Sequence, residues 1–241
     1  MRRLLGRRTA RRDDGAFVIE GPLLLGEAVA AGVPIEVVFV EAGASVPDSG
    51  GAPVHEVAPG VIARVASTVT PQPVLAVAAG CDVALDAVAG AVSFAVVLAG
   101  LADPGNVGTI LRSAEAAGAD AVVLTEGSVD VFNPKVVRAS AGALFRVPVV
   151  VDVPVASVAD LGLPVLGAVA AGGVPYDQAP LDRPCALALG SEAHGLPANL
   201  ALEGLVSIPH AGRAESLNVA MAATVLCFEV ARRRRHRSAT R

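Results

Sequence analysis

Glycines and polar side chains are concentrated in three short loops, and the first of these loops could bind a phosphate group. The stretch DPGNVGTILR, residues 103–112, follows an apolar strand, begins a helix, and holds Asn106, Gly108 and Arg112. Glycine-rich turns between a strand and a helix often bind phosphate, because backbone N–H groups point outward there. Arg112 lies one helical turn beyond Gly108, which has no side chain, so a substrate has room beside the guanidinium group. The alternative is a capped surface helix with Arg112 paired to Glu115.

The same loop predicts how its helix begins. Pro104 and Gly105 indicate a turn, and Asn106 is expected to cap the helix by accepting a backbone N–H bond. The loop does not contain the GxGxxG fingerprint, so it does not favour a nicotinamide site. Four apolar residues recur at helical spacing and predict the buried face of the helix: Val107, Ile110, Leu111 and Ala114.

The second loop, LGSEAHGL at residues 189–196, follows a very apolar strand. Gly190 and Gly195 would let the backbone approach a ligand closely. Glu192 lies between them and could orient an arginine. The alternative is a plain turn with a solvated Glu192 and with His194 as a bystander. The spacing of the four histidines does not predict a metal site.

The third loop, IPHAGRAESLN at residues 208–218, leads into the last helix. Ser216 is expected at the N-cap, and Leu217 and Asn218 are expected to start the helix. Asn218 would then lie in the first turn, where its amide can reach another loop. The alternative is ordinary capping. We interpret an apolar stripe farther along this helix as core packing: Val219, Ala222, Ala223 and Leu226.

Strands and helices alternate along the chain, which predicts an α/β fold with a mostly parallel sheet covered on both faces. Ligands of such sheets bind at the carboxyl ends of the strands. The three loops follow strands that end near Leu101, Leu189 and Ile208. We therefore expect the loops to meet at one edge of the sheet.

The first part of the chain predicts a smaller α/β unit. Helices are expected over residues 22–31 and 59–67, and strands over 35–40 and 73–79. A linker at residues 87–91 then leads to the second unit.

The composition predicts a soluble cytoplasmic protein. Hydrophobic residues make up 53% of the 241 residues and charged residues 17%, which excludes a disordered chain. The longest apolar stretch, residues 87–102, is too short to span a bilayer, and no secretory signal is visible. Three cysteines without CxxC spacing predict buried, reduced thiols, as in cytosolic proteins.

Positive charge is concentrated at the two ends of the chain. The middle of the chain holds all 23 acidic residues and only seven basic ones. Basic ends on an acidic body favour contacts with a polyanion, and the alternative is solvated, frayed ends. Twelve of the nineteen basic residues lie at the ends: Arg2, Arg3, Arg7, Arg8, Arg11, Arg12, Arg232, Arg233, Arg234, Arg235, Arg237 and Arg241.

Taken together, the three loops resemble the three motifs of a known family. NVGTILR, GSEAHG and IPHAGRAESLN, in this order, are similar to those of the SpoU, or TrmH, family of the SPOUT class. Members of that family are S-adenosylmethionine-dependent RNA ribose 2′-O-methyltransferases. The segment NPKVVRASAGALFRVPV also resembles the stretch between the first two motifs, and the resemblance covers about residues 93–232. FVIEGPLLLGEA and STVTPQPVLAV resemble the small substrate-binding domain often placed ahead of it.

The resemblance implies a fold and an assembly that periodicity does not predict. It implies a deep trefoil knot at the C-terminal end of the sheet, whereas general topology rules predict an unknotted one. It implies a homodimer through helices near the site, with the active site completed at that interface. It divides the chain into a small α/β RNA substrate-binding domain with a basic N-terminal arm, residues 1–88, and a SPOUT methyltransferase domain with a basic C-terminal tail, residues 89–241.

The resemblance also implies roles for individual residues. The catalytic residues would be Arg112, Asn106, Glu192, Ser216 and Asn218. S-Adenosylmethionine would be held by Leu189, Gly190, Gly195, Ile208, Pro209, Leu217 and Asn218. Separately from the resemblance, the basic N-terminal end and the first domain are expected to supply RNA affinity, through Arg7, Arg8, Arg11, Arg12 and Arg138. No metal and no membrane are expected.

The resemblance leaves the substrate open between two kinds of RNA. The separate N-terminal domain favours ribosomal RNA, and the alternatives are transfer RNA or a non-catalytic RNA-binding module with the same fold. A guanidinium group has a pKa above ~12, so we expect Arg112 to stabilise a developing alkoxide and grip a phosphate rather than act as a base.

Overall fold

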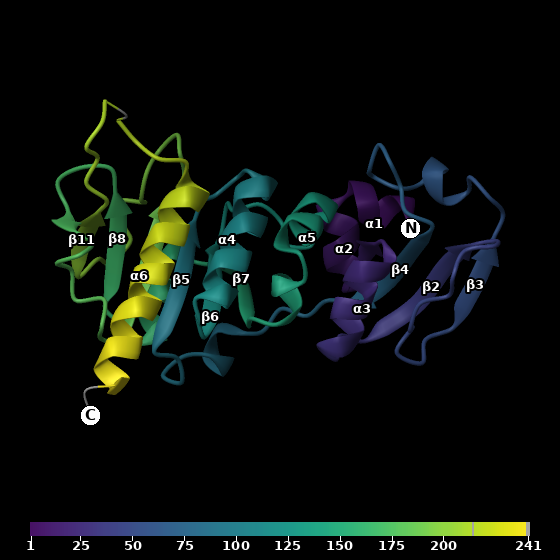
Figure 1. The fold of residues 1–241 in the computed structure, drawn as a ribbon, viewed down its shortest axis with the longest axis horizontal. Coiled ribbons are helices and arrows are strands. Elements are labelled where there is room, and N and C mark those ends of the chain that lie inside the picture. Colours follow the sequence, from purple (N-terminus) through teal and green to yellow (C-terminus); the bar gives the residue numbers. More distant parts are fainter. Residues whose placement is uncertain (214, 240–241) are drawn as a thin grey trace. The chain divides into compact units, whose positions relative to one another are not determined.

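The computed structural model describes residues 1–213 and 215–239, which form two compact units (Figure 1). The first unit contains Met1–Cys81 and Asp130–Arg146, and the second contains Asp82–Val129 and Val147–Arg241. The short excursion at 130–146 therefore belongs to the first unit, although it lies within the sequence predicted as the second domain. The division predicted at residue 88 remains a prediction. Arg241 lies outside the described residues.

The first unit is built on a four-stranded mixed sheet with the order β1-β4-β2-β3. The β1/β4 and β2/β4 pairs are antiparallel, and the β2/β3 pair is parallel. The strand β3 was not predicted. Its helices and strands are α1 (Arg2–Gly6), α2 (Arg8–Asp14), β1 (Ala16–Glu20), α3 (Pro22–Ala30), β2 (Ile35–Glu41), β3 (Val54–Val57), β4 (Val74–Ala79) and α5 (Pro134–Ser140), with 3₁₀ turns at Ile62–Arg64 and Ala143–Phe145.

The helix predicted over residues 59–67 is wrong. Only a 3₁₀ turn forms there, over Ile62–Arg64. Gly60 has a φ of 79°, which an α-helix does not allow, and the Glu41 carboxylate accepts the backbone N–H groups of Gly60 and Ile62. Because Gly60 is not in a helical conformation, the α-helix predicted from residue 59 does not form, and Glu41 stabilises the turn in its place.

The basic N-terminal segment is folded and packed. It forms α1 and α2, and Leu4, Ala10 and Arg11 are buried. Gly15, at a φ of 59°, ends α2 in the left-handed conformation and turns the chain into β1. Apart from the buried Arg11, the arginines of this segment are therefore exposed on a folded part of the chain.

The second unit is built on a seven-stranded sheet with the order β7-β6-β5-β10-β8-β11-β9. Every pair in it is parallel, which confirms the predicted parallel sheet. Its helices and strands are β5 (Phe94–Ala99), α4 (Pro104–Ala116), β6 (Ala121–Thr125), β7 (Val149–Val153), β8 (Val165–Val169), β9 (Val174–Pro175), β10 (Cys185–Gly190), β11 (Gly204–Ser207) and α6 (Val219–Ala239), with 3₁₀ turns at Leu85–Ala87 and Val155–Leu161.

The sheet is covered on both faces. Figure 1 shows α4 and α6 side by side on one face, and the Ser113 and Thr224 hydroxyls lie 2.6 Å apart between these helices. On the other face, Ala95 and Val97 of β5 pack with Val158 and Leu161 of the second 3₁₀ turn. All six residues of β5 are buried, as expected for a strand between two layers.

Two further expectations concern the whole chain. No helix among the described residues is long and apolar enough to cross a membrane. The trefoil knot implied by the family resemblance remains a prediction.

Candidate functional site

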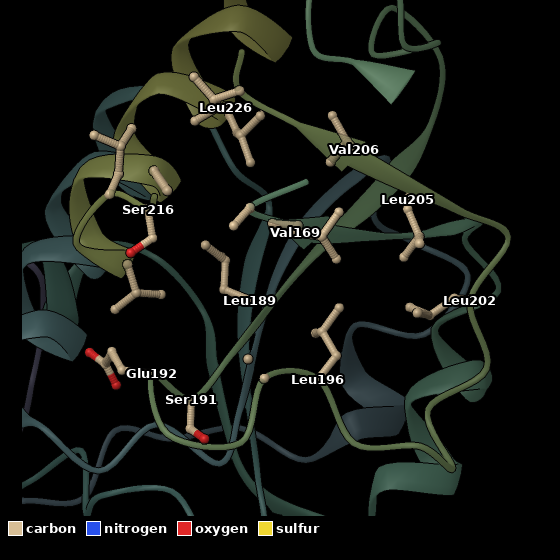
Figure 2. Close-up of a pocket in the computed structure, with 18 of the residues that line it drawn as sticks. Val169, Leu189, Ser191, Glu192, Leu196, Leu202, Leu205, Val206, Ser216 and Leu226 are labelled. Carbon is tan, nitrogen blue, oxygen red and sulfur yellow. The ribbon is translucent and has the colours of Figure 1, made fainter. Parts of the chain in front are cut away.

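A cavity of about 560 Å³ lies at the carboxyl ends of three neighbouring parallel strands. Val169 ends β8, Gly190 ends β10, and Ile208 directly follows β11. All three line the cavity. Figure 2 shows apolar side chains such as Leu189 and Leu196 pointing into it, with Glu192 and Ser216 at one side. We predicted that the three loops meet at one edge of the sheet, and the second and third loops line the cavity at this edge.

Gly190 allows the second loop to fold back over the end of its strand. A Cβ atom at Gly190 would lie 2.2 Å from the carbonyl carbon of Gly195, closer than real Cβ atoms approach. The loop is closed by the Gly195 N–H, which donates to the Ser191 carbonyl at 2.8 Å, and Gly195 has a φ of 67°. Both glycines are therefore required by the backbone, and the close approach leaves the cavity beside β10 open.

Hydrogen bonds join all three loops at one side of the cavity. Asn106 donates from its amide nitrogen to the Glu192 carboxylate. The Asn218 amide nitrogen donates to the Asn106 amide oxygen at 3.1 Å. Asn106 is thus the central member of a chain between Asn218 and Glu192, which lie 26 residues apart in the sequence. The structure brings together the polar residues that the sequence analysis selected from separate loops.

The helix caps differ from those predicted. Asp103 caps α4 by accepting the Asn106 N–H at 2.7 Å, so the prediction that Asn106 is the cap is wrong. Pro104 takes the first helical position after this cap. Proline suits that position because it has no N–H group. The amide side chain of Asn106 is consequently available to Glu192.

The cap of the last helix is Asn218, and the predicted cap at Ser216 is wrong. Asn218 Oδ1 accepts the N–H groups of Ala220 at 2.9 Å and Met221 at 3.4 Å, and α6 begins at Val219. One oxygen of Asn218 therefore caps the helix while its nitrogen reaches Asn106. Ser216 precedes the helix and lines the cavity.

The cavity includes most of the residues predicted to hold a cofactor. Five of the predicted cofactor residues line it: Leu189, Gly190, Gly195, Ile208 and Leu217. Pro209 and Asn218 are not among its lining residues. Glu192 and Ser216, predicted as catalytic, also line it.

Arg112 lies on α4, outside the set of residues that line the cavity. Six residues separate it from Asn106, a rise of about 9 Å along the helix. Its side chain is exposed and has no hydrogen bond or ion pair with any residue that the structure describes. The alternative pairing with Glu115 is therefore not found among these residues, and the guanidinium group is available to a ligand.

The arginines expected to contact RNA fall into two groups. Three are exposed: Arg7, between α1 and α2, and Arg8 and Arg12, on α2. Arg11 is buried, with its side chain 5% exposed, and its guanidinium group lies 2.6 Å from the Asp130 carboxylate. Arg138 is half-buried and donates to Glu20 and to the Ser67 hydroxyl. Arg11 and Arg138 are therefore engaged inside the first unit.

Part of the cavity wall was not predicted. The end of β8 contributes Val169, and Leu196, Leu202 and Leu205 form an apolar wall. Leu226 of α6, interpreted from the sequence as core, also lines the cavity, as do Val219 and Ala222. The seven-residue spacing of Val219 and Leu226 places them on one helix face, but sequence cannot distinguish a face that meets a core from one that meets a cavity.

The cavity suits an organic cofactor rather than a metal ion. Its walls are mainly aliphatic, with a few polar groups at the side near Glu192. That combination is typical of sites that bind a nucleoside or a similar small molecule. Among residues 1–213 and 215–239, no group of three or more His, Cys, Asp or Glu side chains could hold a metal ion.

Two family models match the chain. The model described as the SpoU rRNA Methylase family matches residues 93–228. The model described as the MRM3-like substrate binding domain matches residues 1–76. The first match covers more than half of the chain and includes all three loops.

Individual proteins resemble almost the whole chain. The 23S rRNA (guanosine(2553)-2′-O)-methyltransferase RlmP of Bacillus subtilis (strain 168) is 34% identical over 91% of this chain and 90% of its own. The crystal structure of the SpoU methyltransferase AviRb of Streptomyces viridochromogenes, in complex with the cofactor AdoMet, has a TM-score of 0.87 at 28% identity and covers 97% of this chain and 96% of its own. The AdoMet-bound rRNA methyltransferase of Sinorhizobium meliloti has a TM-score of 0.85 at 30% identity, with 98% and 93% covered.

Proposed function

The chain belongs to the SpoU rRNA methylase family, and from this premise we infer that it is an RNA methyltransferase that uses S-adenosylmethionine. It methylates a ribose 2′-hydroxyl, and its substrate is ribosomal RNA. The observation that carries this conclusion is the cavity at the strand ends, where Gly190, Ile208 and Leu217 meet beside the Asn106–Glu192 hydrogen bond.

The residues present fit S-adenosylmethionine. Leu189, Ile208 and Leu226 offer apolar surface to an adenine ring, and Gly190 lines the same cavity, where the close packing of the Gly195 and Leu196 backbone against it holds the loop in place. When bound, S-adenosylmethionine supplies an electrophilic methyl group on a sulfonium. Glu192 and Ser216 supply polar groups to the same cavity.

We propose that Arg112 stabilises the reacting ribose oxygen. Negative charge grows on the ribose oxygen as it attacks the methyl group, and a fixed guanidinium group stabilises that charge. Arg112 can also hold a neighbouring phosphate through its remaining N–H groups. It does not accept the proton, because a guanidinium group stays protonated at neutral pH and has no free lone pair, so the hydroxyl proton passes to water.

We propose that three residues position the groups of the active site: Asn106, Glu192 and Asn218. Their hydrogen bonds tie the start of α4 to the second loop and to the start of α6. The start of the helix that carries Arg112 is therefore held in register with the loops that line the cofactor cavity. Precise placement of this kind accounts for a large part of the rate enhancement in transfer reactions.

We further propose a homodimer through α4 and α6. Three exposed apolar side chains of α6 and one residue just before the helix recur at spacings of three and four residues: Met221, Val225 and Phe228 on the helix, and Leu217 ahead of it. An exposed apolar stripe on a helix favours an interface, and a twofold pairing would let each copy present the same stripe. Since Leu217 also lines the cavity and Arg112 lies outside it, the partner would complete the active site.

The dimer is tested by sedimentation of Phe228→Glu and Met221→Glu. Each charge would have to be buried in the interface, so both variants should sediment as monomers and lose methyl transfer. If both remain dimers, the stripe is not the interface.

We propose RNA contacts for Arg7, Arg8 and Arg12, and we omit Arg11 and Arg138 because both are held by carboxylates inside the unit. Removing residues 1–12 would also remove the buried Leu4 and Ala10, so point variants are the better test. Arg7→Gln and Arg8→Gln should each weaken RNA binding and flatten its salt dependence, by about 0.7–0.9 in the log–log slope for each lost phosphate contact. An unchanged slope would exclude these residues from the RNA surface.

Transfer RNA and a non-catalytic role have less support. RlmP and the Sinorhizobium meliloti protein are named for rRNA, and both match nearly the full chain. A module that only binds RNA does not need the cavity. We place the protein in the cytoplasm, consistent with three free cysteines and with access to ribosomal RNA.

The function is tested by two measurements. Calorimetry with S-adenosylmethionine should give one site per chain. Mapping of 2′-O-methylation in the RNA of cells with and without the protein should reveal one missing methyl group in ribosomal RNA. If the cells without the protein lack a methyl group in transfer RNA instead, transfer RNA is the substrate. If the protein binds the cofactor but these cells lack no methyl group, the catalytic assignment is wrong.

A further inference from the structure

A second cavity, of about 410 Å³, lies at the other end of α6, and three of its five lining residues are arginines. Its lining residues are Asp182, Arg232, Arg233, His236 and Arg237. Whereas the start of α6 borders the carboxyl ends of the strands, its last turns reach their amino ends, where Arg234 donates to the Ser93 carbonyl at 2.6 Å. These two cavities therefore lie at opposite ends of α6, a helix whose course can be followed in Figure 1.

The arginine run of this helix has members with different roles. Arg234 donates to the Ser93 and Arg183 carbonyls and lies over the Phe94 ring, 5.2 Å from its centroid. Arg233 donates to the Asp177 carbonyl and to Glu229. These two side chains hold the end of the helix against the sheet, so the run is not a solvated tail.

Glu229 orients two of the guanidinium groups. It accepts two hydrogen bonds from Arg232, both at 2.7 Å, and one from Arg233 at 2.7 Å. The hydrogen bonds from Arg232, together with those from Arg233, lower the pKa of Glu229 to about 2. Its side chain is 8% exposed, whereas that of Arg232 is 51% exposed. The single carboxylate therefore fixes Arg232 in place while leaving much of that guanidinium group accessible.

Helical spacing concentrates the charge on one face. Positions 229, 232, 233, 236 and 237 recur at intervals of three and four residues and so share a face. Arg235 lies outside this face and does not line the cavity. Arg237 is exposed and has no ion pair with any residue the structure describes. Asp182 is the one carboxylate among the lining residues, so positive charge is in excess there.

We propose that this cavity binds a phosphodiester group of the RNA substrate, held by Arg232 and Arg237, at a site separate from the cofactor cavity. Guanidinium groups are suited to phosphate oxygens, which they bind in a bidentate manner, and Glu229 already holds that of Arg232 in place. The surrounding middle of the chain is strongly acidic, so a local cationic cavity would select where the RNA backbone crosses the second unit. This proposal rests on the proposed function, since it takes RNA as the ligand.

The test compares two substitutions that remove the same charge from the same helix end. Binding of a labelled RNA hairpin is measured over a range of salt concentrations for Arg237→Gln and for the matched control Arg235→Gln. For Arg237→Gln we expect the log–log salt slope to fall by about 0.8, which corresponds to about sixfold weaker binding at 0.1 M salt. Arg235→Gln should change both quantities by much less. The double variant Arg232→Gln/Arg237→Gln should show about twice the slope change.

Two further measurements separate the possible failures. Calorimetry with S-adenosylmethionine and thermal unfolding check that each variant keeps its fold and its other cavity. Equal effects of Arg235→Gln and Arg237→Gln would mean a diffuse charge effect and would overturn the site. If Arg237→Gln alone weakens binding while the wild-type protein transfers no methyl group to RNA, the phosphate site stands and the proposed catalytic function fails.

Discussion

The arginines of the two units show how the same residue type takes different roles. In the first unit, Arg11, Arg138 and Arg146 each pair with a carboxylate, from Asp130, Glu20 and Glu27 respectively. In the second unit, Arg112 is exposed near a cavity and has no partner among the described residues.

The difference lies in the cost of removing a charge from water. A buried guanidinium group requires a carboxylate partner, and once paired it stabilises the fold and cannot approach a substrate. An exposed, unpaired guanidinium group keeps all its N–H groups for a ligand. The comparison predicts that substitutions of these paired arginines in the first unit change stability, whereas substitution of Arg112 changes catalysis.

The largest expected effect is that of Arg112→Ala. Methyl transfer should fall by about 10³-fold or more, because the group that stabilises the developing alkoxide is removed. S-Adenosylmethionine should still bind, because Arg112 does not line the cavity. Single-turnover methylation and calorimetry measure the two quantities. Near-normal turnover would show that Arg112 is not the catalytic arginine.

Arg11→Ala should reduce stability by about 3–5 kcal/mol, because it leaves the Asp130 carboxylate without its buried partner. Denaturant unfolding measures this change. The exposed neighbour provides the control, since Arg12→Ala should stay within about 0.5 kcal/mol of wild type. Equal unfolding of both variants would contradict the structural role of Arg11.

Arg138→Gln should reduce stability by a smaller amount, about 1–2 kcal/mol, because its side chain is 31% exposed and solvent screens the pair with Glu20. The RNA affinity of Arg138→Gln should change by no more than that of the control Arg146→Gln. The ion pair of Arg146 is more exposed than that of Arg138. If the RNA affinity of Arg138→Gln alone depended markedly less on salt, Arg138 would be an RNA-binding residue after all.

The smallest expected change in stability is that of Glu229→Gln. Glu229 is a carboxylate of the second unit that pairs with arginines, as Asp130 and Glu20 do in the first unit. Folding lowers its pKa from 4.5 to about 2, so its pairing stabilises the fold fully above about pH 4.5. That contribution is lost as the pH falls from 4.5 toward 2. Because Arg232 is half-exposed, we expect a difference of only about 1 kcal/mol between wild type and Glu229→Gln at neutral pH. Urea unfolding at pH 7 and pH 3 should show this difference shrinking at the lower pH, and a constant difference would contradict it.

Much of the site was predictable because its parts are local. Gly190, Gly195 and Ile208 follow apolar strands, and the carboxyl ends of parallel strands meet at one edge, so their presence at one cavity followed from order and pattern. The caps were not predictable in the same way. Asp103 and Asn106 are both good N-cap residues, and only the position of Glu192 explains why Asn106 uses its side chain elsewhere.

The sequence by itself determined the apolar strands, the helix periods and the three loops with their glycines, because these depend on the nearest residues along the chain. Only the tertiary structure decided which arginines are paired, that 130–146 belongs to the first unit, and that the buried core residue Leu226 also borders a cavity. Those outcomes depend on residues that are distant in sequence and become neighbours only when the sheet forms. Burial then determines whether a charge must find a partner.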